Sequence, residues 1–276
     1  MSAKLKLTLA CGDYEIVQAL KNGSIAPDGI ELNVLTDLAS SDIQNFQDLN
    51  GKRIGLKTYQ ATAILYLRGL LADEYGVDLS SIDWVTELEE EIPFETPPGI
   101  RLSQAPAGSD ISEMLAEGEV DAVIHPDIIM PILRGDNRVG RLFADYRTEE
   151  EAYYRRTGIF PIMHATAIRN EILEEHPWVA NNLAQAFEKA KFAAYRRMSN
   201  PRIVPLAWFL DEWDAQRELL GADPWEFGLT PSNRKNLETL IRYSKAGGLI
   251  SKLDTVDDFY MDVMLESRGR GEWAQG

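Results

Sequence analysis

The alternation of apolar and polar residues along the chain predicts strands and helices in succession. Period-two alternation or short apolar runs predict strands at 4–11, 29–35, up to residue 56 after a turn, from 84, at 120–124 and at 159–168. Helical spacing and capping residues predict helices at 14–20, 61–75, 110–118, 177–198, 204–219, 232–246 and 255–267. Residues 86–99 are acidic and contain prolines, which predicts a loop. Strands that alternate with helices predict an α/β fold with a largely parallel sheet.

Composition narrows the classes of partner and site. The 276 residues are 45% hydrophobic, enough for one large domain or two medium ones. A net charge of −16 argues against nucleic acid and anionic membranes as partners, but a few buried arginines can still bind a small organic anion. Cys11 is the single cysteine, which excludes an internal disulfide. The three histidines lack metal-ligand spacing, and no cofactor motif is present, so we expect neither a metal nor a cofactor.

The N-terminal residues predict a location. Residues 4–9 alternate in the manner of a strand, and no apolar segment of signal-peptide length precedes Cys11. No later segment is apolar enough over a sufficient length to predict a membrane span. We therefore expect a cytoplasmic protein, provided that the N-terminus is complete.

The run Tyr153–His164 combines side chains that suit an aromatic or small organic anion. Arg155 and Arg156 can bind carboxylates in a bidentate manner, the paired tyrosines can flank a flat ligand, and His164 can exchange a proton near neutral pH. Each also has a simpler interpretation. A histidine in an apolar strand is often a satisfied core residue, and the arginines could pair with the acidic residues 149–151.

Two further groups of residues lie where predicted strands end. Tyr59, Gln60 and Thr62 precede or begin a predicted helix, whose N-terminal N–H groups favour an anion; an ordinary helix cap is the alternative. His125 follows the predicted strand 120–124, and loops at the carboxyl ends of parallel strands line binding crevices; a surface turn is the alternative.

Several segments together resemble the 4,5-dihydroxyphthalate decarboxylase family. They are Leu7–Tyr14, Gly51–Gly55, Tyr59–Ala63, Gly118–Ala122, Gly140–Arg147, Tyr153–His164, His176–Val179 and Asn233–Lys235. The resemblance covers nearly the whole chain, and Tyr153–His164 is its most specific part.

The resemblance implies a two-lobed, type II periplasmic-binding-protein-like fold. Residues 1–45 with about 171–276 would form lobe 1, and about 46–170 would form lobe 2. Members of the family have several tens of further residues between positions corresponding to Leu35 and Gln47, so the first lobe is expected to be incomplete, with the seam near Thr36–Ser41. An internally deleted, inactive relative and an artefact of the gene model are therefore alternatives.

The resemblance also implies an activity, a carboxy-lyase reaction that converts 4,5-dihydroxyphthalate to protocatechuate and CO2. The implied roles are His164 as proton donor and Arg156 as carboxylate clamp, with Arg155 second. The remaining expected substrate-binding residues are Tyr59, Gln60, Thr62, His125 and Thr157. The alternatives are a solute-binding protein of an ABC transporter type and another small-acid enzyme on the same fold, such as those of menaquinone biosynthesis. The expected partner is a small aromatic carboxylate, and the family is compatible with a homo-oligomer.

Overall fold

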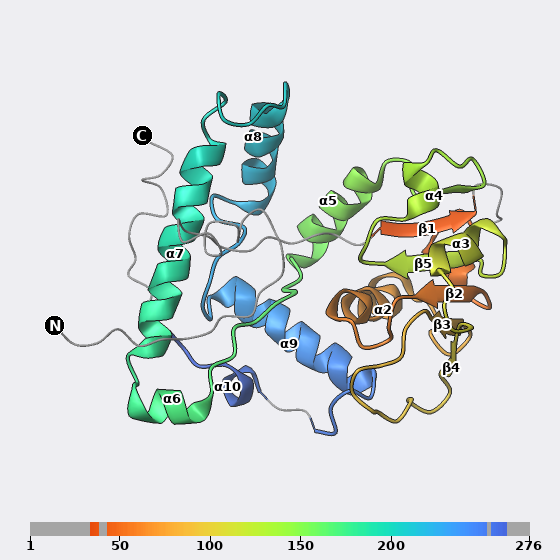
Figure 1. Ribbon diagram of the computed structural model, residues 1–276, viewed down its shortest axis with the longest axis horizontal. Coiled ribbons are helices and arrows are strands. Elements are labelled where there is room, and N and C mark those ends of the chain that lie inside the picture. The colour runs from red at the N-terminus through yellow and green to blue at the C-terminus, as the bar shows by residue number, and fades with distance from the viewer. Residues whose placement is uncertain (1–33, 39–42, 253–254, 264–276) are drawn as a thin grey trace. The chain divides into compact units, whose positions relative to one another are not determined.

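The computed structural model describes residues 34–38, 43–252 and 255–263, and the chain divides into two compact units (Figure 1). Unit 1 consists of Met1–Ile30, Thr166–Thr230 and Met261–Gly276. Unit 2 consists of Glu31–Ala165 and Pro231–Tyr260, and it holds the sheet. The candidate site residues all belong to unit 2.

The sheet of unit 2 has the strand order β4-β3-β2-β5-β1-β6. Its strands are β1 (Val34–Leu38), β2 (Arg53–Leu56), β3 (Asp83–Thr86), β4 (Arg101–Gln104), β5 (Ala122–His125) and β6 (Val139–Arg141). The pairs β3–β4, β2–β3 and β2–β5 are parallel, whereas β1 is antiparallel to both β5 and β6. The parallel part therefore has its carboxyl ends on one edge of the sheet.

Each face of the parallel strands packs against a different helix. Side chains alternate along a strand, so Ile54 and Trp84 join the core cluster that contains the apolar side of α2 (Thr62–Tyr75). Val85 and Val123 point the other way and join the cluster of α3 (Ile111–Ala116). Gly55 permits this second contact, because a Cβ there would overlap the side chain on the first residue of α3. The result is a helix–sheet–helix arrangement that orients the carboxyl edge.

The remaining helices complete the two units. Unit 2 also contains η1 (Phe46–Leu49), α4 (Met130–Leu133), α5 (Tyr146–Thr157), α9 (Pro231–Ala246) and α10 (Val256–Phe259). Unit 1 contains α6 (Asn170–Glu175), α7 (Val179–Met198) and α8 (Phe209–Leu220). Helix α9 packs along α2, where Gly69 faces the ring of Tyr243 (Figure 1).

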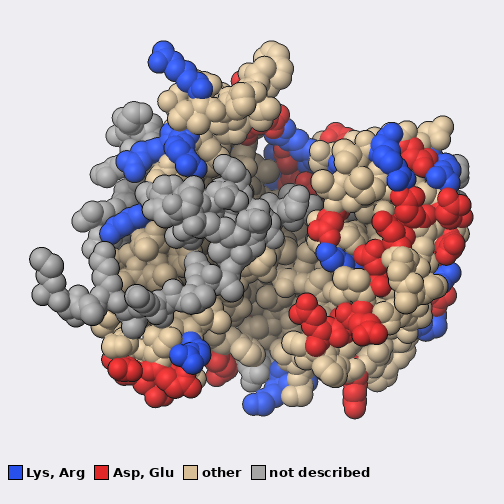
Figure 2. Space-filling model, viewed as in Figure 1, with Lys and Arg blue, Asp and Glu red and all other residues tan. Residues whose placement is uncertain are grey.

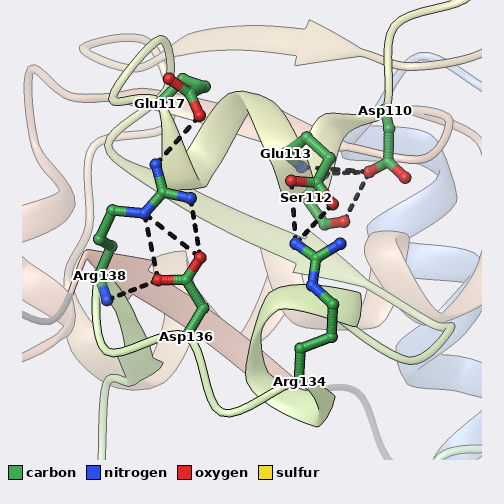
Figure 3. Close-up of polar contacts among 7 residues, drawn as sticks. All are labelled: Asp110, Ser112, Glu113, Glu117, Arg134, Asp136 and Arg138. Atoms are coloured by element: carbon green, nitrogen blue, oxygen red, sulfur yellow. Dashed lines mark hydrogen bonds and ion pairs between the residues drawn. The ribbon is translucent and has the colours of Figure 1, made fainter.

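Helix α3 is fixed at its start and along its length by polar contacts (Figure 3). The Asp110 side chain caps the helix by accepting hydrogen bonds from the backbone N–H groups two and three residues later, at 2.8 and 3.2 Å. Glu113 and Glu117 form ion pairs with Arg134 and Arg138 at 2.8 and 3.0 Å. The capped helix supplies the backbone N–H of Ile111 to the site described below.

Unit 1 contains a buried ion pair between α7 and the loop after α8. Lys191 is 3% exposed, and its Nζ lies 2.6 Å from Asp223 and 2.9 Å from Glu188. The Tyr195 hydroxyl lies 3.0 Å from the other oxygen of Asp223. Burial, together with the negative charge of Asp223, raises the pKa of Tyr195 well above its ordinary value.

Most predicted elements in the described residues are confirmed, including the α/β class and a largely parallel sheet, but the helix predicted at 255–267 ends at Phe259, where Tyr260 is extended. The predicted strand at 159–168 is wrong, because Ile159 and its neighbours pack as irregular chain, and residues 164–167 are exposed. The predictions at 4–11, 14–20 and most of 29–35 lie outside the described residues. Of the seam near Thr36–Ser41, residues 36–38 belong to β1, and residues 39–41 lie outside the described residues. Of the helices in the described part of the chain, none is long and apolar enough to cross a membrane.

The predicted lobe boundaries differ from the two units at three elements. The sequence groups residues 1–45 and the C-terminal helices in lobe 1, whereas the structure groups β1, α9 and α10 with unit 2. The reason is physical: β1 pairs with β5 and β6, and α9 packs on α2. The assignment of the rest of lobe 1 stays a prediction.

Candidate functional site

Four polar side chains meet at the carboxyl edge of the parallel strands. Lys57 follows β2, Glu87 follows β3, His125 ends β5, and Asp127 lies two residues later. Parallel strands bring their carboxyl ends to one edge, where open α/β sheets bind ligands. We call Lys57, Glu87, His125 and Asp127 the edge cluster.

The imidazole of His125 is held on both sides. Its Nδ1 accepts a hydrogen bond from the backbone N–H of Asp127 at 3.1 Å, which leaves the proton of the neutral ring on Nε2. Nε2 lies 3.2 Å from Glu87 Oε2 and donates to it, while Glu87 Oε1 accepts from the backbone N–H of Ile111 at 3.2 Å. Because His125 is only 8% exposed and both nitrogens are engaged, it orients the Glu87 carboxylate.

Lys57 and Asp127 form the more exposed part of the edge cluster. The Lys57 Nζ and an Asp127 carboxylate oxygen form an ion pair, and the side chain of Asp127 is mostly exposed. Such an exposed pair is worth little in stability, so either member can exchange its partner for a ligand. In Figure 2, acidic and basic side chains are interspersed over the part of unit 2 that carries the strands.

The segment before α2 contacts a carboxylate from the protein itself. The backbone N–H groups of Tyr59 and Gln60 donate to Glu90 Oε1 and Oε2, at 2.5 and 3.1 Å. The Gln60 side chain donates to the backbone oxygen of Ile92 at 2.5 Å, and Thr62 is the first residue of the helix. In this structure the N–H groups of Tyr59 and Gln60 contact Glu90, and the binding of a substrate anion there stays a prediction.

Tyr59 contributes its backbone to this position, while its side chain is part of the core. The ring is 1% exposed and stacks on Phe94 with centroids 5.6 Å apart. Burial raises the pKa of the Tyr59 hydroxyl, an effect that the charge of Arg68 opposes. The Tyr59 side chain therefore belongs to the core in this structure, and a role for Tyr59 in substrate binding stays a prediction.

Arg68 is a buried cation next to the same segment. It is 2% exposed, its guanidinium carbon lies 3.3 Å from the Tyr59 ring centroid, and its Nη2 donates to the Tyr59 carbonyl at 2.9 Å. Its Nε is buried without a hydrogen-bond partner. Burial lowers the pKa of Arg68 to about 10, and Tyr59 and Glu90 oppose that effect.

Comparison with known proteins identifies the family. No family model matches the chain. A 4,5-dihydroxyphthalate decarboxylase of Comamonas testosteroni is 36% identical over 238 residues, which cover 83% of this chain and 72% of that protein. The chain belongs to the 4,5-dihydroxyphthalate decarboxylase family. A protein of the same name from Pseudomonas putida is 34% identical over 119 residues, 41% of this chain and 46% of that protein.

Among solved structures, the chain is similar to periplasmic sulfonate-binding proteins. One from Methylobacillus flagellatus is 16% identical with a TM-score of 0.47, and the similarity covers 80% of this chain and 61% of that one. The Escherichia coli aliphatic sulphonate-binding protein is 12% identical with a TM-score of 0.45, over 92% of this chain and 74% of that one.

The run Tyr153–His164 begins on helix α5. Arg155 pairs with Glu151 within this helix at 2.9 Å, so the simpler interpretation, an ion cluster with the acidic residues of the helix, describes Arg155. Arg156 donates from Nε to Glu74 at 2.8 Å, near the end of α2. Thr157 ends α5, where its hydroxyl donates to the Tyr153 carbonyl at 2.8 Å.

The length of α2 separates Arg156 from the anion position. Glu74, the partner of Arg156, lies twelve residues after Thr62 on the helix, which corresponds to about 18 Å along its axis. One substituted benzene ring does not span that distance. In this arrangement, Arg156 therefore cannot clamp a ligand that also contacts Gln60.

The chain after α5 returns toward the start of α2. The Tyr66 hydroxyl, one turn after Thr62, is hydrogen-bonded by the backbone of Ile162 and donates to the Asn236 carbonyl at 2.8 Å. Met163 packs against the cluster that contains Tyr66. His164 is the next residue and is exposed. It therefore lies nearer to the first half of α2 than to the end of α2 where Arg156 binds Glu74.

Four side chains near this edge are not among the residues predicted from the sequence: Lys57, Glu87, Glu90 and Arg68. The first two directly follow predicted strands, so the argument that selected His125 also applies to them. Across the part of the chain that the structure describes, no group of three His, Cys, Asp or Glu side chains could hold a metal ion.

Proposed function

We propose that this protein decarboxylates a dihydroxylated aromatic dicarboxylate, 4,5-dihydroxyphthalate, to protocatechuate and CO2. The observation that carries the proposal is 36% identity over 83% of the chain to a protein of that name. The edge cluster supports it, because carboxylates can accept hydrogen bonds from adjacent ring hydroxyls and Lys57 can balance negative charge.

The substrate's own ring makes the reaction feasible. Each ring hydroxyl is para to a carboxylate, so removing the hydroxyl proton moves electron density to the carbon that carries this carboxylate. A proton added to that carbon gives a dienone. The bond to the carboxylate then breaks, its electron pair returns to the ring, CO2 leaves, and the phenolate recovers a proton. One proton is consumed at carbon, and no oxidant or reductant is required.

The edge cluster suits the first step. Glu87, oriented by His125, accepts the hydroxyl proton, and the Lys57 ammonium stabilises the resulting phenolate. His164 remains the proposed proton donor to carbon, since it is exposed and lies on the segment that returns toward α2. His125 acts through Glu87 and is a positioning residue.

The test compares Glu87→Gln with Glu89→Gln, an exposed neighbour in the same acidic loop. Protocatechuate is measured by chromatography at saturating 4,5-dihydroxyphthalate. Loss of a general base lowers kcat about 100-fold or more, while the control keeps its rate. Equal rates for both variants would remove Glu87 from the mechanism. Binding of the substrate by the unsubstituted protein without any product would instead indicate a solute-binding protein.

We also propose a cytoplasmic enzyme that can form a homo-oligomer. Both statements come from the sequence. Cell fractionation with an antibody against the chain tests the first, and light scattering of the purified protein tests the second. Recovery in the periplasmic fraction, or a mass of 31.0 kDa at all concentrations, would contradict them.

A further inference from the structure

Glu90 occupies a position that is built for a carboxylate. Its two oxygens accept separately from the successive backbone N–H groups of Tyr59 and Gln60. These groups lie directly before α2, a helix of fourteen residues, whose dipole favours negative charge at this end. The geometry is that of a bidentate carboxylate contact, supplied here by a side chain from the loop at 86–99.

Arg68 gives this position a second, independent source of affinity for anions. Its guanidinium is almost fully buried against the Tyr59 ring, and it donates to the carbonyl of the residue whose N–H contacts Glu90. The buried Nε has no hydrogen-bond partner. A buried cation without a direct carboxylate contact gains from an anion nearby, and in this structure Glu90 is that anion.

We propose that the N–H groups of Tyr59 and Gln60, backed by Arg68, bind a carboxylate of the substrate, and that Glu90 is a built-in competitor that the substrate displaces. The identity of the ligand as an aromatic dicarboxylate rests on the proposed function. The exchange replaces one carboxylate by another, so the hydrogen bonds balance. The affinity for substrate is reduced by the free energy that holds Glu90 in place.

The position follows the same two strands as part of the edge cluster. Lys57 comes directly after β2, and Tyr59 and Gln60 follow shortly after it; Glu87 comes directly after β3, and Glu90 follows shortly after it. A ligand with hydroxyls on the edge cluster and a carboxylate on these N–H groups would therefore span one edge of the sheet. Arg156, at the far end of α2, is not needed for that contact.

The experiment measures binding of phthalate, which has the two carboxylates but no hydroxyl to start the reaction. Isothermal titration compares the unsubstituted protein with Glu90→Gln, Glu90→Ala and the control Glu91→Gln, an exposed neighbour in the same loop. Removing the competitor tightens phthalate binding by about tenfold or more, while the control, which removes the same charge, changes it less than twofold. In the unsubstituted protein, phthalate also shifts the amide resonances of Tyr59 and Gln60.

Unchanged or weaker binding by both Glu90 variants, with the far-ultraviolet circular dichroism of the unsubstituted protein, would overturn the proposal. The proposal would also be overturned if the amide resonances of Tyr59 and Gln60 did not shift when phthalate is added. The outcomes are separable from the activity. If the Glu90 variants bind phthalate more tightly but the protein forms no protocatechuate from 4,5-dihydroxyphthalate, the carboxylate position is retained and the decarboxylase activity is rejected. If protocatechuate forms but the Glu90 variants do not bind phthalate more tightly, the activity is retained and the carboxylate position is rejected.

Discussion

Replacing Arg68 by methionine tests whether the buried cation serves binding at the expense of stability. Burial lowers the pKa of Arg68 to about 10, which corresponds to a cost of about 3 kcal/mol for folding with the charged form. Because the folded pKa lies below the ordinary value, this cost is fully present at neutral pH and is relieved only as the pH rises above about 10. At pH 7, Arg68→Met therefore removes the whole cost of burying the charged guanidinium.

Two losses oppose this gain. The Tyr59 carbonyl loses its donor, which costs about 1–3 kcal/mol, and the contact of the guanidinium with the Tyr59 ring is worth about 1–2 kcal/mol. Methionine fills much of the same space. The terms nearly cancel, so we expect the free energy of unfolding to stay within about 1 kcal/mol of the unsubstituted protein. Phthalate affinity should fall about tenfold or more.

Lys191→Met is the matched comparison, since Lys191 is equally buried but contacts carboxylates directly. Its removal leaves Asp223 buried and uncompensated, a loss of about 3–5 kcal/mol. Urea unfolding followed by circular dichroism gives the midpoint and slope for each variant. If Arg68→Met lowered stability as much as Lys191→Met, with an unchanged slope, Arg68 would be a structural residue and the reasoning would be refuted.

Three further predictions concern helices α2, α5 and α9 and the segment after α5. Gly69→Ala should lower the free energy of unfolding, measured by urea unfolding, by about 1–3 kcal/mol, because the added Cβ overlaps the ring of Tyr243. This loss exceeds the gain from the better helix propensity of alanine, and a more stable variant would contradict the packing. Arg156→Ala should change phthalate affinity no more than the control Arg155→Ala, and a selective loss of a few kcal/mol would restore Arg156 as the clamp. His164→Ala should lower kcat about 100-fold with little change in KM, whereas unchanged turnover would exclude His164 as the proton donor.

The elements predicted from sequence succeed where local signals suffice. Helix α2 has an apolar stripe and ends at Gly76, whose φ of 65° is the left-handed conformation that glycine adopts readily, and the structure confirms both. The predicted strand at 159–168 fails, because the backbone N–H of Phe160 is satisfied by the Asn236 side chain of α9 at 2.9 Å. A contact across 76 residues leaves no local pattern.

The candidate site was predictable only in part, for similar reasons. His125 ends β5 and Gln60 follows β2, and the rule for parallel sheets places both at the carboxyl edge. That rule does not select Glu90, which lies inside a long acidic loop, or Arg68, which lies in the middle of helix α2. Arg156 and His164 are close in sequence, yet α5 packs at the far end of α2, so their spacing along the chain misrepresents their separation in the fold.

The most direct test of the account is incubation of the purified protein with 4,5-dihydroxyphthalate, with chromatography for protocatechuate and detection of CO2. The account predicts both products in equal amounts, with loss of turnover in Glu87→Gln and retention in Glu89→Gln. A folded protein that binds phthalate but forms neither product would contradict the proposed decarboxylation.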